Sequence, residues 1–470
     1  MHLPALNIPD LLIALWRATL ECDVGDNRAS WDWAVLRDPK VWKRHGYLVA
    51  AARSYLPSSF GRPPRNPAEK INSGYKAWEF LIYIYGFCPA LLYGILPDVY
   101  WCNFCKLVLG IRILHQRVIL KVELRLAHKV LIEFCFEFEA AYYQRKPSRI
   151  HFVRPSIHQL SHCAPETQRI GPLGLSTQWP IERSIGDFGQ QIRQPSNPFQ
   201  NLAVRGTQRA CINALHAIYP QFSDPSQPLR GSVNLGGGYT LLRKLDDTHR
   251  PVQCCAVGSC LPEGCCERRA FDIFRQDELG VAEKDTAFGW GGEVKRWGRL
   301  SIPSGQIARS EWVEKQESRI ARCVKVWQRN AGKQEDVFGE IRYFARLNAA
   351  SGPRTVAMVY LFGPPDTSLV KKSLGVVCAM EYTGIAKVFD VTAISSVVAL
   401  VPFPRDSAAM ADERLQSIPE GAGLGEQRRY DQPAFFIGWK YFLVEKLGLL
   451  ISCMGGGEMD EEAEEENRDE

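Results

Sequence analysis

The chain of 470 residues is too long for one typical hydrophobic core, so its length predicts two or three domains. A composition of 46% hydrophobic and 23% charged residues indicates a globular protein and argues against a chain that is disordered throughout. The formal net charge is +5, but residues 458–470 hold nine of the 52 acidic residues and one of the 57 basic ones, which leaves +13 on the preceding residues. A basic body fits a polyanionic partner, whereas an acidic run is typical of a solvated, disordered end.

The fifteen cysteines and the apolar segments bear on the compartment. The first 23 residues lack a basic leader and interrupt their apolar run with Pro9 and Asp10, so we expect no secretory signal and reduced thiols, in a nuclear or cytoplasmic protein. The longest uncharged run, residues 80–96, is short for a bilayer crossing and contains Pro89. We expect this run to be a buried core helix, and we expect no membrane partner.

Helical patterns dominate residues 1–223. Leu, Trp and Ala recur at helical spacing over residues 8–52, and prolines and arginines then concentrate in a linker-like segment at residues 55–70. Further helices are predicted to begin near Pro155 and Pro180 and to cover residues 197–220, the last with Asn197 as its cap. Within residues 71–146 one apolar stripe is expected to face the core: Leu124, Ala127, Leu131, Phe134, Phe138 and Ala141.

The pattern changes near residue 224, beyond which short β-rich runs alternate with Gly, Pro and Asp. This spacing predicts an antiparallel barrel or a sandwich-like module, and the run Gly236 to Gly238 is expected to form a hairpin turn rather than a phosphate-binding loop. The predicted fold class is therefore α+β. The expected units are a helical domain at 1–223, a linker or insertion at 224–285, a β-rich module at 286–450 and a disordered acidic tail at 451–470.

Histidine and cysteine groups raise the question of a metal. His158 and His162 are four residues apart on one face of the helix expected from Pro155, a spacing that allows both imidazoles to reach one ion, although hydrogen-bonded structural histidines have the same spacing. The lone pair Cys102 and Cys105 is expected to be buried thiols. A denser cluster could bind zinc, but it lacks both the paired spacing of zinc sites and a histidine: Cys254, Cys255, Cys260, Cys265 and Cys266.

Arginines predominate between residues 183 and 209, where no acid follows Asp187. If the helix over residues 197–220 forms, Arg205 and Arg209 share a face, and they repel each other unless an anion or a carboxylate lies opposite. Contact with nucleic-acid phosphates would meet this condition, and a solvated basic face is the alternative. The candidate nucleic-acid-binding residues are Arg183, Arg193, Arg205 and Arg209.

Glu182 precedes this arginine-rich segment. It could be the last member of a carboxylate cluster that holds Mg²⁺ or Mn²⁺ for attack on a phosphodiester, since these hard cations prefer oxygen ligands. The alternative is an acid in the first turn of a helix, stabilised by the macrodipole and paired with Arg183.

Long strings of this sequence resemble the C-terminal half of CACTA-like transposases of the fungal, basidiomycete Plavaka type. The most specific string is QWPIERSIGDFGQQIRQPSNPF at residues 178–199, and others are FGRPPRNPAEKINSGYKAWEFLIYIYG at 60–86, LLYGILPDVYWCNFCKLV at 91–108 and IHFVRPSIHQLSH at 150–162. The resemblance implies that the helical half belongs to an RNase H-like core in which two aspartates and a glutamate hold metal ions for DNA strand transfer. Glu182 then corresponds to the third carboxylate, and His158 and His162 to a motif of the family.

The chain departs from this family where the two catalytic aspartates are expected. Asp23, Asp26 and Asp32 are present, but no sequence feature marks them as catalytic. We therefore expect a truncated or co-opted transposase that lacks a complete catalytic site and binds DNA or a partner, with a full-length transposase or a second copy as possible protein partners. One alternative is a Mg²⁺- or Mn²⁺-dependent strand-transfer enzyme whose missing acids come from another chain, or from Asp23 or Asp32. Another is a peptide- or chromatin-binding β-barrel that uses Trp297, Trp312 and Trp327 as surface contacts, although these side chains equally fit a core.

Overall fold

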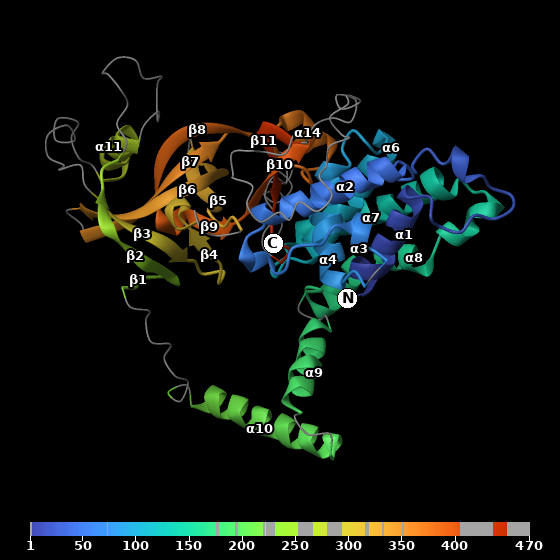
Figure 1. The fold of residues 1–470 in the computed structure, drawn as a ribbon, viewed down its shortest axis with the longest axis horizontal. Helices are drawn as coiled ribbons and strands as arrows, with labels where there is room; N and C mark the ends of the chain where they lie inside the picture. Colours follow the sequence, from blue (N-terminus) through green and yellow to red (C-terminus); the bar gives the residue numbers. More distant parts are fainter. Residues whose placement is uncertain are drawn as a thin grey trace, which may run out of the picture.

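The two halves of the chain differ in secondary structure, as the computed structural model shows (Figure 1). Helices extend as far as Ile218, and an antiparallel sheet with short covering helices follows from Val233. This arrangement confirms the predicted α+β class. The described residues are 2–72, 74–174, 178–192, 196–219, 221, 231–251, 267–279, 294–314, 319–330, 333–349, 352–404 and 436–448, so the acidic tail lies outside them.

The described part of the helical half consists of ten α-helices and several short 3-10 and π-helices. The π-helices are η1 (Leu3–Asn7), η5 (Tyr83–Phe87) and η6 (Glu139–Tyr143), and the 3-10 helices are η2 (Arg28–Ser30), η3 (Ala52–Tyr55), η4 (Ser58–Phe60) and η7 (Pro147–Phe152). The helices are α1 (Ile8–Trp16), α2 (Pro39–Ala51), α3 (Pro67–Lys70), α4 (Ala77–Ile82), α5 (Cys88–Leu91), α6 (Asp98–Leu114), α7 (Lys121–Phe138), α8 (Pro155–Ile170), α9 (Trp179–Gln191) and α10 (Pro198–Ile218).

The core of the helical half centres on α6 and α7. The predicted stripe of α7 is buried at Ala127, Leu131, Phe134 and Phe138, which confirms its assignment to the core. The two helices approach closely at Gly110, where a Cβ atom would lie 2.6 Å from Cγ of Leu131. Most side chains of α4, η5 and α5 are buried in the same core, as expected for the long uncharged run. Among the described residues, no helix is both long and apolar enough to span a membrane.

The described strands form one sheet in which every pairing is antiparallel. The strands follow the order β1-β2-β3-β6-β7-β8-β11-β10, with β4 beside β3 and with β5 pairing both β6 and β9. Their bounds are β1 (Val233–Gly236), β2 (Tyr239–His249), β3 (Val294–Ser301), β4 (Ile307–Arg309), β5 (Cys323–Asn330), β6 (Lys333–Ala349), β7 (Gly352–Phe362), β8 (Ala379–Asp390), β9 (Ile394–Val397), β10 (Ala399–Pro404) and β11 (Phe436–Val444).

Both faces of this sheet carry a buried apolar cluster. One face encloses an apolar core that includes Leu300, Val324 and Phe344. The other face packs against α11 (Glu267–Leu279) through Phe271 and Phe274. The short elements α13 (Glu311–Glu314), α14 (Thr367–Lys372) and η9 (Val391–Ala393) lie between strands. The glycines of the β1–β2 turn have positive φ, +81° at Gly236 and +58° at Gly237, which confirms the predicted hairpin.

The helical and β halves share a core, which the sequence did not predict. Val401 and Phe403 of β10 and Phe442 and Val444 of β11 belong to the same buried cluster as α6 and α7. The C-terminal strands therefore complete the packing of the N-terminal helices.

Residues 55–70, predicted as linker-like, form part of this joint between the halves. The guanidinium of Arg319 donates hydrogen bonds to the carbonyls of Leu56 and Pro57, both at 2.7 Å, and of Gly61 at 2.8 Å. The N–H of Ile320 donates to the carbonyl of Ser54 at 2.7 Å. The segment is thus a docking surface for the β half.

Candidate nucleic-acid interface

Helices α9 and α10 extend away from the rest of the helical half as a two-helix arm (Figure 1). They begin at Trp179 and Pro198, which confirms the two helix starts predicted near Pro180 and Asn197. The predicted cap is wrong in detail: Asn197 precedes α10 with φ +54°, and its side chain makes no capping hydrogen bond. No residue of α10 is buried, so this helix of 21 residues presents most of its circumference to solvent.

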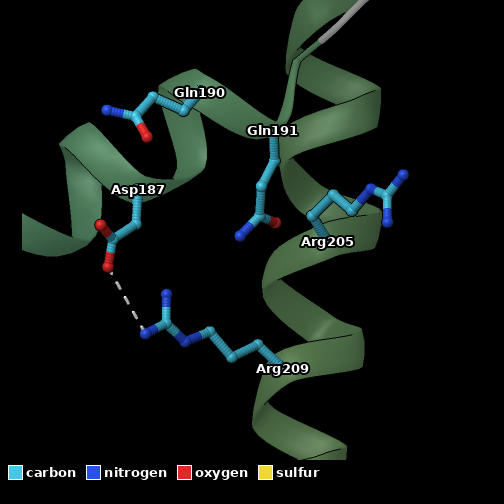
Figure 2. A pocket seen from close by; sticks show the side chains of 5 residues that line it. All are labelled: Asp187, Gln190, Gln191, Arg205 and Arg209. Carbon is cyan, nitrogen blue, oxygen red and sulfur yellow. Dashed lines mark ion pairs between the residues drawn. The ribbon is translucent and has the colours of Figure 1, made fainter.

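A cleft of about 600 Å³ lies between the two helices of the arm (Figure 2). It is lined by Asp187, Gln190 and Gln191 from α9 and by Arg205 and Arg209 from α10. The structure therefore brings together two of the four predicted arginines, one turn apart on one helix. The glutamines beside them were not anticipated from the sequence, because only the packing of α9 on α10 places them there.

A carboxylate lies opposite one of these arginines. Nη2 of Arg209 is 3.7 Å from Oδ2 of Asp187, and its guanidinium carbon is 5.4 Å from the ring centre of Phe188. Both members of the ion pair are exposed, so the pair contributes little stability. Arg205 is exposed and has no ion-pair partner within the described ranges. The carboxylate expected opposite the two arginines is therefore present for Arg209, and none pairs with Arg205 in the described part of the arm.

The remaining residues of the predicted site lie elsewhere on the arm or outside the described residues. Glu182 and Arg183 are exposed in the first turn of α9, and no ion pair joins them in the described structure. Arg193 lies outside the described residues. Over the ranges that the structure describes, no group of three or more His, Cys, Asp or Glu side chains could hold a metal ion. The assignment of Glu182 as a third carboxylate stays a prediction.

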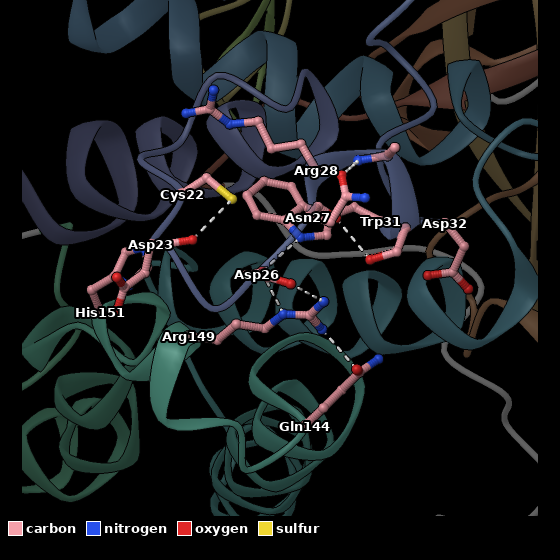
Figure 3. Close-up of polar contacts among 12 residues, drawn as sticks. Cys22, Asp23, Asp26, Asn27, Arg28, Trp31, Asp32, Gln144, Arg149 and His151 are labelled. Carbon is pink, nitrogen blue, oxygen red and sulfur yellow. Dashed lines mark hydrogen bonds and ion pairs between the residues drawn. The ribbon is translucent and has the colours of Figure 1, made fainter.

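Two of the three aspartates named in the sequence analysis accept hydrogen bonds from side chains of the helical half (Figure 3). Asp26 accepts two hydrogen bonds of 2.7 Å from Nε and Nη2 of the buried Arg149. Asp32 accepts a bond of 2.6 Å from the hydroxyl of Tyr100, whereas Asp23 is exposed and accepts from the N–H of Val24. Asp26 and Asp32 therefore have structural bonds within the helical half.

The predicted histidine pair lies on α8. Nε2 of His158 and Nε2 of His162 are 3.0 Å apart, and both side chains are exposed. Among the predicted thiols, Cys105 is buried and Cys102 is half-buried, both free and both on α6. The cluster Cys254, Cys255, Cys260, Cys265 and Cys266 lies outside the described residues.

The tryptophans proposed as surface contacts of the β half have unequal exposure. Trp297 is buried in the sheet core and Trp327 is half-buried against it, so both fit the core assignment. Trp312 is 43% exposed and stacks on the guanidinium of Arg296, whose carbon is 4.3 Å from the ring centre. Only Trp312 of the three offers a substantial exposed ring.

The buried carboxylate of Glu267, the first residue of α11, was not predicted from the sequence. Glu267 accepts a hydrogen bond of 2.9 Å from the hydroxyl of Tyr343, and Nε2 of His249 lies 3.2 Å from it. Burial raises the pKa of Tyr343 well above its ordinary value, and the neighbouring Glu267 adds to this effect. Tyr343 therefore stays a neutral donor that holds the first turn of α11 on the sheet.

Fold and site together define an α+β protein with an exposed two-helix arm that carries arginines and amide side chains. Comparison with protein-family models, curated proteins and solved structures found no match to this chain.

Proposed function

We propose that this chain is a transposase-derived protein of the CACTA-like Plavaka type that lacks a complete catalytic site and binds nucleic acid through α9 and α10. The observation that carries the proposal is the charge of α10, whose only Lys, Arg, Asp or Glu residues are Arg205 and Arg209, both exposed. They are separated by about 6 Å along the helix axis, a length over which one DNA strand presents about two phosphates.

The partners already present in the cleft do not prevent phosphate binding. The exposed pair of Arg209 with Asp187 is weak, and a phosphate offers the guanidinium a bidentate, doubly charge-assisted contact in its place. Gln190 and Gln191 contribute amide donors, which commonly contact phosphate and sugar oxygens. The formal charge of +13 on the residues before the acidic tail attracts the polyanion over a longer range.

The proposed contacts are to the sugar-phosphate backbone of the nucleic acid, so the affinity should depend on salt concentration rather than on base sequence. We expect fluorescence anisotropy with a labelled duplex to give an affinity that falls steeply between 50 and 200 mM salt. Replacing both arginines, Arg205→Ala with Arg209→Ala, should weaken binding to unrelated sequences equally and reduce the salt slope by about 1.8, since each phosphate contact contributes about 0.9.

Arg169→Ala is the control, because Arg169 is an exposed helical arginine that is paired with Glu166 on α8, away from the arm. It should leave affinity and slope unchanged. An affinity that hardly responds to salt, or a double variant that binds like the parent protein, would reject phosphate contact by the arm.

The alternative is a metal-dependent strand-transfer enzyme with Glu182 as third carboxylate, belonging to an RNase H-like core and completed by another chain. We propose binding rather than catalysis because contact of the exposed arginines of the arm with phosphates requires no metal ligands. Incubation of the purified protein with Mn²⁺ and labelled DNA should therefore give no cut or joined strands. Cleavage that Glu182→Gln abolishes while DNA affinity persists would establish the enzyme instead.

A further inference from the structure

The exposed face of α8 carries two imidazoles whose ring nitrogens meet. His158 and His162 are one helical turn apart, their ring planes are nearly perpendicular at 78°, and their Nε2 atoms are 3.0 Å apart. Such a contact is either an N–H···N hydrogen bond between the two rings or the arrangement of two nitrogens that bind a common ion.

From this geometry we propose that His158 and His162 form a binding site for a divalent transition-metal ion that prefers imidazole, such as Ni²⁺, Cu²⁺ or Zn²⁺. An ion about 2.1 Å from each nitrogen would see the two at an angle of roughly 90°, which fits neighbouring positions of an octahedral or square-planar shell. Mg²⁺ prefers oxygen ligands and is not expected to bind here.

The rest of α8 holds the two rings in place. Its inner face is anchored in the core by Ile157, Leu160 and Ala164, so the outer face has a fixed orientation. Folding of the helix therefore brings the two ligands together before an ion arrives, which lowers the conformational cost of binding.

Neighbouring side chains leave the remaining coordination positions open. Cys163 is buried, and its thiol donates a hydrogen bond of 3.4 Å to the carbonyl of Gln159, so it does not join the exposed pair. The carboxylate of Glu166, one turn further along the helix, is bound by Arg169 at 2.6 Å. The chain thus supplies two ligands, and water or a partner molecule supplies the others.

Hydrogen exchange measured on the whole 470-residue chain tests the proposed site directly at α8. NiCl₂ should slow amide exchange in peptides that cover Pro155–Ile170, by about 100-fold for amides that exchange through opening of α8, when the free ion reaches about 100 times its dissociation constant. The slowing should disappear in His158→Ala and in His162→Ala. It should persist in His128→Ala, which removes an exposed histidine from α7.

Local measurement separates this site from other ligands, because nickel bound to cysteines elsewhere would protect other peptides. MgCl₂ at the same concentration should have no effect on α8. The proposal is overturned if nickel leaves these peptides unchanged in the parent protein, if the protection survives in both single variants, or if magnesium protects equally. Exchange rates of the same peptides in the ion-free variants show whether α8 still forms, as expected because alanine favours a helix at both positions.

Discussion

Asp26 and Arg149 form a buried, bidentate ion pair between segments that lie 123 residues apart in the chain. Nε1 of Trp31 donates a further bond of 2.8 Å to the carboxylate, and the guanidinium carbon lies 5.0 Å from the ring centre of Trp33. The pair therefore connects the loop after α1 to η7 within the helical half.

Asp26→Asn should destabilise the protein by about 3 to 5 kcal/mol at pH 7, because it leaves the charge of Arg149 buried without a counterion. Urea unfolding followed by tryptophan fluorescence measures this loss. Asp10→Asn is the control, since Asp10 pairs with Arg154 at the surface and should change stability by less than about 1 kcal/mol. Equal losses in the two variants would contradict a special role of the buried pair.

The same pair predicts an acid-sensitive stability. The hydrogen bonds from Arg149 are the main cause that lowers the pKa of Asp26 from 3.8 to about 2. A carboxylate with a lowered pKa in the folded state stabilises the protein above the pKa of the unfolded chain and loses that contribution as the pH falls through the folded value. We expect about 2 kcal/mol of stability to disappear between about pH 4 and pH 2, and to be absent from the pH profile of Asp26→Asn.

Arg319→Ala should loosen the joint between the two halves. It removes three bonds from one guanidinium to backbone carbonyls, and we expect a loss of about 2 to 4 kcal/mol in urea unfolding. Arg319→Lys should lose most of the same stability, because an ammonium cannot span the three acceptors as the planar fork does. Arg354→Ala, which breaks a half-buried ion pair with Asp390 within the sheet, is the control. If Arg319→Ala destabilises the protein no more than Arg354→Ala does, the role of Arg319 in the joint is contradicted.

Two helical glycines should respond to alanine in opposite ways. Gly110→Ala puts a methyl group against Leu131 and should cost about 1 to 3 kcal/mol in urea unfolding, more than the gain in helix propensity. A Cβ at Gly206 on α10 would meet no atom within 4 Å, so Gly206→Ala should stabilise the arm by up to about 1 kcal/mol and slow hydrogen exchange over Pro198–Ile218. Stabilisation by Gly110→Ala would show that α6 and α7 tolerate a wider separation.

Deletion of residues 458–470 should tighten DNA binding, because nine acids on one tail compete with phosphates for the basic surface. The gain should be largest at low salt and should shrink as the ionic strength rises. Replacing the nine acids with serine, at unchanged length, separates charge from chain length and should have the same effect. Unchanged affinity in both variants would exclude the tail as a competitor.

Local sequence signals predicted where helices and a hairpin lie. The contacts that the sequence did not predict depend on packing between distant segments. Proline at the first turn located α8 and α9 because its missing N–H costs nothing there, and the glycine run located the β1–β2 hairpin because its backbone needs positive φ. Spacing placed Arg205 and Arg209 on one face. The bonds of Asp26 with Arg149, and of Arg319 with residues more than 250 positions earlier, have no local pattern that could reveal them.

The shared core also sets the order in which the chain can fold during synthesis. Phe442 and Val444 pack among helices whose residues leave the ribosome hundreds of codons earlier. Until β11 is made, the growing helical half has to keep an apolar surface uncovered, and such surfaces promote aggregation. Chain termination before residue 436 should therefore yield a protein that depends on chaperones rather than a smaller independent domain.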